Sequence, residues 1–265
     1  MTHFDDPTMR RLFVFSHPNH ELAVFGLVQR LRPNFLYLTD GGGGKRVAET
    51  RHGLQSVGLL DRARFLDYSE RAFYGALLQR DVRFCENVAA AIRRETDALQ
   101  AEQVFCDAVE FYNPVHDLTL PLVLHALRGK SGVSVFELPL VYQSVGPHET
   151  YQVQRFPLSR QEEQVMLELT KTELAAKTRS WGEIYRQLRG QMQPITDRLP
   201  ANHAAREVFR PAPGVLPEPD AERVLRYEWR GHLHLARGAI DEVITYADHY
   251  RPLTSRLSGI IRSQP

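Results

Sequence analysis

LFVFSHPNHELAVFG, residues 12–26, is the stretch around which the rest of the chain can be organised. It opens with an apolar run that predicts a buried strand, and the apolar residues from Leu22 onward predict the start of a helix. The turn between them holds His17 and His20, at a position where open α/β sheets bind ligands. Two imidazoles so close together could share a metal ion, and a turn of ordinary polar residues is the alternative.

The composition describes a globular chain of 265 residues, long enough for one large domain or a domain with an appendage. The formal net charge of +1 provides no strong field to attract nucleic acid or an anionic membrane, so we expect neither as a partner. Two cysteines predict no disulfide framework, which favours a reducing compartment. Without an apolar signal core or a run long enough to span a bilayer, the chain is expected to be cytoplasmic.

Strand and helix patterns alternate after the opening stretch. We predict later strands near residues 35–39, 64–68, 103–108 and 133–140, and helices near residues 21–31, 47–59, 82–99 and 118–127. This alternation predicts an α/β fold with a Rossmann-like, mainly parallel sheet flanked by helices.

The pattern changes near Ser159. Ser159 and Glu162 match a capping box and predict a helix that runs to Arg179. Two further helical stretches are predicted at residues 181–189 and 221–250.

A segment rich in proline and glycine, near residues 210–219, separates these helical stretches. We therefore expect an α/β domain over residues 1–214 and a helical C-terminal extension over residues 215–265. The extension has an apolar face that could pack on the domain or on another subunit, so a homo-oligomer is compatible with the sequence.

A third histidine, His116, follows the fourth predicted strand. If the first and fourth strands lie near one another in the sheet, His17, His20 and His116 converge. Three imidazoles and a water molecule form a known catalytic zinc arrangement, in which the water becomes acidic near neutral pH. Asp40 and the glycines at residues 41–44 predict a mobile loop over such a site, because the spacing of a phosphate-binding loop is absent.

These motifs, in this order, resemble those of the LmbE-like (PIG-L) de-N-acetylases. That family has a strand ending in A/P-H-P-D-D-E, then T-D-G, an R-x-x-E helix ending in L-G, and later H-P-D-H. The matching segments here are SHPNHE at residues 16–21, TDG at 39–41, RVAE at 46–49 with VG at 57–58, and NPVH at 113–116. The similarity covers about residues 12–130 and, more loosely, residues 172–209.

The resemblance implies a small-molecule substrate, an N-acylated sugar or glycoconjugate, and one zinc ion per chain. His17, His20 and His116 occupy the three zinc-ligand positions, with His20 in place of an aspartate. Arg46 and Asp40 are the residues expected to contact the substrate, and a surface ion pair is the alternative role for Arg46.

Three polar catalytic positions depart from the family pattern. Asn19 stands where the family has its general-base aspartate, and an amide cannot accept that proton at neutral pH. Asn113 and Val115 stand where the family has an oxyanion-stabilising histidine and the aspartate that orients it. Losing a general base typically costs about 10²–10⁴-fold in rate.

Two functions follow from this pattern. In the first, the chain is a hydrolase: a third imidazole raises the charge of the zinc site and acidifies the bound water, while Asn19 and Asn113 act as catalytic hydrogen-bonding groups. In the second, the chain is a catalytically degenerate binding protein, or an enzyme of altered metal-dependent chemistry. The carboxylates that could shuttle protons in a hydrolase are Glu21, Asp40, Glu110 and Asp117.

Overall fold

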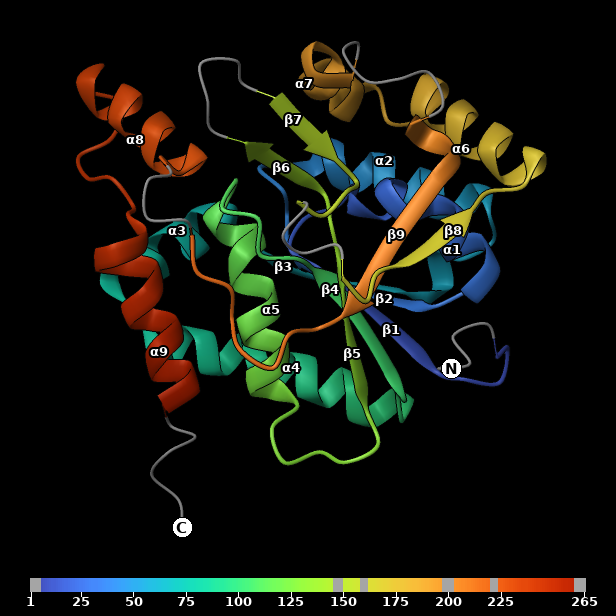
Figure 1. Ribbon diagram of the computed structural model, residues 1–265, viewed down its shortest axis with the longest axis horizontal. Helices are drawn as coiled ribbons and strands as arrows, with labels where there is room; N and C mark the ends of the chain where they lie inside the picture. The colour runs from blue at the N-terminus through green and yellow to red at the C-terminus, as the bar shows by residue number, and fades with distance from the viewer. Residues whose placement is uncertain (1–5, 145–149, 158–161, 197–202, 220–223, 260–265) are drawn as a thin grey trace.

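A seven-stranded sheet forms the centre of the protein (Figure 1). The structure is a computed structural model that describes residues 6–144, 150–157, 162–196, 203–219 and 224–259. The strands are β1 (Arg11–Phe15), β2 (Asn34–Thr39), β3 (Ala63–Tyr68), β4 (Gln103–Asp107), β5 (Ser134–Leu138), β8 (Val165–Glu168) and β9 (Arg206–Pro211), and a separate hairpin joins β6 (Val141–Ser144) to β7 (Thr150–Val153).

The strand order is β3-β2-β1-β4-β5-β9-β8. Strands β1 to β5 run parallel, and β9 runs antiparallel to both of its neighbours. The predicted α/β class with a mainly parallel sheet is therefore confirmed.

Both faces of the sheet are covered by helices, which explains the unbroken apolar run of β1. Alternate residues of a strand point to opposite faces. Leu12 and Val14 pack with α3, α4, α5 and α9, whereas Phe13 and Phe15 pack with α1 and α2. The helices are α1 (Phe25–Leu31), α2 (Gly44–Ser56), α3 (Glu70–Gln79), α4 (Val82–Leu99), α5 (Pro114–Ala126), α6 (Lys171–Glu183), α7 (Arg186–Thr196), α8 (Arg226–Ala236) and α9 (Arg251–Gly259).

The predicted helix from Ser159 is wrong. Ser159 lies outside the described residues, but Val165–Glu168 form β8, which pairs with β9 at the edge of the sheet. Helix α6 begins only at Lys171, where Thr170 and Glu173 form the capping box. The two pairs look alike in the sequence, but the pairing of Val165–Glu168 with a distant strand excludes one continuous helix from Ser159 to Arg179.

Two other predicted helices are wrong in extent. Residues 181–189 divide between α6 and α7, because the chain leaves the helical path at the buried Tyr185. Residues 221–250, described from residue 224, contain α8, a non-helical segment that follows the left-handed Gly238, and a π-helical turn over Tyr246–Tyr250.

The end of the described chain packs on the α/β core. In Figure 1, α9 lies alongside α5 and α4, and its Leu253 and Leu257 are buried in the same apolar cluster as those helices. The Tyr250 hydroxyl donates to the Asp117 carbonyl at 2.7 Å. These contacts join the last helix to the first turn of α5.

Strand β9 and helix α6 together hold the beginning of α1. The Glu207 carboxylate accepts hydrogen bonds from the backbone N–H groups of Gly26 and Leu27, at 2.9 and 2.7 Å. Lys177 donates to the same carboxylate and to the Ala23 carbonyl, both at 2.8 Å. A buried ion pair from late in the chain therefore fixes the helix that follows the histidine turn.

The described residues include no helix with the length and apolarity needed to cross a bilayer. Cys85 and Cys106 are both buried as free thiols. Burial raises the pKa of both thiols, so neither is a reactive thiolate at neutral pH.

Candidate metal centre

The three histidines lie where the strand order of the sheet reverses. The turn after β1 carries His17 and His20, and the first turn of α5, which follows β4, carries His116. Strands β1 and β4 are direct neighbours in the sheet, with Phe13 opposite Phe105. The chain continues from β1 to β2 on one side and from β4 to β5 on the other side. The gap between two strands whose connections diverge in this way is the usual ligand crevice of an open α/β fold.

The three imidazoles meet at this crevice. Potential ligand atoms of His17, His20 and His116 all lie within 4.8 Å of one another. The ring centroids are 5.3 Å apart for His17 and His20, 4.8 Å for His17 and His116, and 4.5 Å for His20 and His116. All three residues are buried. The convergence that the metal hypothesis required is therefore present.

Two of the histidines each contact a carboxylate. His17 Nε2 lies 3.1 Å from Glu70 Oε1, at the start of α3. His20 Nδ1 lies 3.1 Å from each Asp107 oxygen, at the end of β4. Asp107 also accepts hydrogen bonds from the Ser16 backbone N–H at 2.8 Å and from the Ser16 hydroxyl at 2.6 Å. Such carboxylates orient metal-ligating histidines and fix their tautomers.

His116 is held by the backbone around it. Asn113 caps α5 by accepting the Val115 N–H at 2.9 Å, and Pro114 occupies the first helical turn. Asp117 Oδ1 accepts the N–H groups of the preceding loop at Glu110 and Phe111. Among the described residues, nothing hydrogen-bonds the buried Nδ1 of His116.

Burial keeps two of the rings neutral. Desolvation lowers the pKa of His20 and His116 well below its ordinary value, and the charges of neighbouring histidines and of Arg46 lower both further. Neutral imidazole is the form that binds metal. Together with the unsatisfied Nδ1 of His116, this donor set fits a divalent ion with nitrogen preference, such as zinc.

The two predicted substrate residues have different surroundings. Arg46 is half-buried, its Nε has no hydrogen-bond partner among the described residues, and its charge acts on His20, His116 and Glu70. Asp40 Oδ1 instead accepts the backbone N–H groups of Gly42 at 3.0 Å and Glu70 at 3.2 Å. Arg46 thus has unused donor capacity beside the histidines, whereas Asp40 organises the glycine loop and the start of α3.

Asn19 is hydrogen-bonded to α2 at both ends of its side-chain amide. Its backbone adopts a left-handed conformation with φ 79°. Its side-chain oxygen accepts the Thr50 hydroxyl at 2.8 Å, and its amide nitrogen donates to Glu49 Oε2 at 3.0 Å. Glu49 Oε1 accepts the Gln187 N–H at 2.6 Å, so Arg46 and Glu49 make separate contacts. The catalytic role of Asn19 stays a prediction, because these bonds commit both ends of its amide.

The other carboxylates considered as proton carriers also hold structure. Glu21 accepts the Tyr185 hydroxyl at 2.7 Å, and burial raises its pKa. Glu110 accepts the N–H groups of Leu140 and Val141 at 2.8 and 2.9 Å, and burial raises its pKa well above the usual value.

Sequence reasoning missed the two carboxylates that do contact the histidines. Asp107 ends β4 and is the last residue but one of the strand predicted at residues 103–108. Side chains at the end of such a strand reach a ligand crevice, so its position was a usable indication. Glu70 follows Ser69, which caps α3 by accepting the Ala72 N–H at 3.2 Å. A serine before an amphipathic run was the indication for α3, an element that the sequence patterns did not predict.

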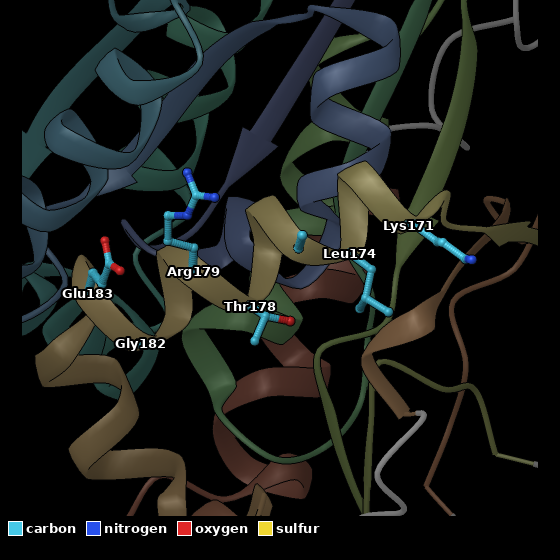
Figure 2. A pocket seen from close by; sticks show the side chains of 7 residues that line it. Lys171, Leu174, Thr178, Arg179, Gly182 and Glu183 are labelled. Carbon is cyan, nitrogen blue, oxygen red and sulfur yellow. The ribbon is translucent and has the colours of Figure 1, made fainter.

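A depression elsewhere on the surface lacks the features of a site. It lies on α6, and Figure 2 shows its side chains rising from that one helix. Its lining residues are Lys171, Leu174, Ala175, Thr178, Arg179, Gly182 and Glu183. Binding sites need polar groups that converge from different elements, and the histidine cluster meets that condition instead.

Comparison with known proteins places the fold. No protein-family model and no curated protein matches the chain. The A40926 pseudoaglycone deacetylase Dbv21 has a similar structure, with a TM-score of 0.57 and 14% identity over 78% of this chain and 97% of that one. A deacetylase of teicoplanin biosynthesis, solved as a bog complex, has a TM-score of 0.56 and 16% identity over 77% of this chain and 97% of that one. At these identities the likeness establishes a shared α/β fold.

Proposed function

We propose that this chain is a metal-dependent amide hydrolase of the de-N-acetylase type, an LmbE-like (PIG-L) protein that removes an N-acyl group from a sugar or glycoconjugate. The observation that carries the proposal is the convergence of His17, His20 and His116 within 4.8 Å at the switch point of the sheet. The fold shared with the A40926 pseudoaglycone deacetylase and with a deacetylase of teicoplanin biosynthesis supports the reaction type.

One zinc ion held by the three histidines is the proposed cofactor. It would act as a Lewis acid in amide hydrolysis. Asp107 would orient His20, and the free donor of Arg46 would bind a substrate oxygen.

The competing function is ligand or metal binding without hydrolysis. It is favoured by one observation, that Asn19 replaces the expected base and has both ends of its amide bonded to α2. In the hydrolase, Asn19 and Asn113 would complete the catalytic set by hydrogen bonding.

We further propose that residues 215–265 form an extension to an α/β domain over residues 1–214, and that the protein works in the cytoplasm. The packing of α9 on α5 supports an extension that packs on the α/β domain of its own subunit. Two buried free thiols fit a reducing compartment.

Metal analysis of the purified protein tests the cofactor. We expect about one equivalent of zinc per chain after zinc supplementation, and its loss in His17→Ala. The matched control is His52→Ala, which changes an exposed histidine of α2. Absence of metal from the supplemented parent protein would contradict the metal centre.

Acetate release from N-acetylated sugars tests the reaction. We expect release by the parent protein and none by His17→Ala. Asn19→Asp is compared alone and together with Glu49→Gln, because the Asn19 amide nitrogen lies 3.0 Å from a Glu49 oxygen. If either aspartate variant creates activity that the parent lacks, the native chain is not a hydrolase.

A further inference from the structure

Helix α3 brings a hydrogen-bonded pair of side chains to the edge of the metal centre. The Glu70 Oε1 atom lies 3.1 Å from His17 Nε2, and the Tyr74 hydroxyl donates to the same oxygen at 3.0 Å. The two residues are one helical turn apart, so both project from the same face of α3. Glu70 therefore contacts His17 with a geometry that Tyr74 maintains.

The placement of Glu70 is fixed from its backbone as well. Its N–H donates to Asp40 Oδ1 at 3.2 Å, which ties the start of α3 to the end of β2. The side chain of Glu70 is 23% exposed, whereas that of His17 is 1% exposed. Glu70 thus closes the solvent side of a buried imidazole.

Glu70 stands outside the ligand set itself. Among the described residues, the group whose ligand atoms are mutually within 4.8 Å contains His17, His20 and His116 alone. Asp107 has the same relation to His20, at 3.1 Å from Nδ1. Each carboxylate therefore contacts one ring nitrogen, and the other nitrogen of His17, Nδ1, lies 3.1 Å from the Ser16 hydroxyl oxygen.

We propose that Glu70, held by Tyr74, is a positioning residue that orients His17 for metal binding. The inference rests on the proposed metal centre and assigns to α3 a role in building it. Removing such an outer carboxylate typically weakens metal affinity by 10–100-fold.

Metal titration of four proteins tests this role. Zn²⁺ affinity is measured by chelator competition for the parent, Glu70→Gln, Tyr74→Phe and the double variant, with Arg71→Gln, an exposed neighbour on α3, as the control. We expect about a 10–100-fold loss for Glu70→Gln, a smaller loss for Tyr74→Phe, and no change for the control. Because Tyr74 acts through Glu70, the double variant should bind no more weakly than Glu70→Gln.

Visible absorption of the Co²⁺-loaded proteins reports the geometry around the ion, and a general loss of stability would not shift the positions of its bands. A reoriented His17 should alter the Co²⁺ bands in Glu70→Gln while the thermal unfolding temperature of the metal-free variant stays near that of the parent. Unchanged affinity and an unchanged spectrum in Glu70→Gln would overturn the positioning role while leaving the metal centre intact. Failure of the parent to bind either ion would overturn both.

Discussion

The three histidines reach one point from two segments that are built differently. The turn after β1 is held by side chains from elsewhere in the chain: Asp107 contacts His20, and Glu70 contacts His17. The start of α5 is held by its own neighbours, since Asn113 caps the helix and Asp117 binds the loop before it. His116 has no carboxylate partner among the described residues.

This difference shows two ways in which a protein can orient a histidine side chain. His17 lies on an irregular turn and His20 at the first residue of a short 3₁₀ helix, His20–Val24, so an external acceptor selects the orientation of each imidazole. An imidazole in the first turn of a capped helix is oriented by the helix, because the backbone sets the direction of the side chain. Substitution of a remote carboxylate should therefore disturb the turn, whereas substitution of the helix cap should disturb the start of α5.

Asp107→Ala should give the largest effect, on the turn. It leaves three buried donors without their acceptor, two on Ser16 and one on His20, and each such group costs about 1–3 kcal/mol. We expect a loss of at least about 3 kcal/mol in the free energy of unfolding by urea, together with loss of zinc. Asp107→Asn, which keeps one acceptor oxygen, should lose less, and an unchanged free energy of unfolding in Asp107→Ala would show that the carboxylate does not anchor the turn.

Asn113→Ala should have an intermediate effect, on the start of α5. Losing the cap costs about 1 kcal/mol of stability and loosens the first turn that carries His116. Denaturant unfolding and zinc titration should both show a modest decrease. Asn113→Asp retains a capping oxygen and should restore stability. If it behaves like the alanine variant, capping is not what holds His116.

Tyr250→Phe should have the smallest effect. It removes the hydrogen bond from the C-terminal segment to the Asp117 carbonyl, at a cost of about 0.5–1.5 kcal/mol. Because the helix cap remains, zinc affinity should stay unchanged while the urea midpoint falls. A parallel loss of zinc affinity would mean that His116 depends on distant support as well, and the contrast between the two segments would disappear.

The sequence predicted the parts of this site that depend on short-range pattern. The buried strand and the histidine turn are visible as an apolar run ending in SHPNHE at residues 16–21, and His116 follows another strand. Their convergence required only that β1 and β4 be neighbours, which the strand order of this fold provides.

The parts that escaped prediction depend on long-range contacts. Glu70 and Asp107 become partners of the histidines only through the packing of α3 and β4 against the turn. Likewise, Val165–Glu168 become a strand because β9 pairs with them, although a capping pattern begins close by at Ser159. Local propensity cannot reveal a partner that lies elsewhere in the chain.

The ion pair of Lys177 and Glu207 has a consequence for the order of folding during synthesis. The histidine turn is synthesised before the carboxylate that holds the adjacent α1, because that carboxylate comes from β9. A contact so distant in sequence forms slowly and only after β9 has been made. The helix that follows His17 and His20 therefore acquires its final support long after the turn itself has been synthesised.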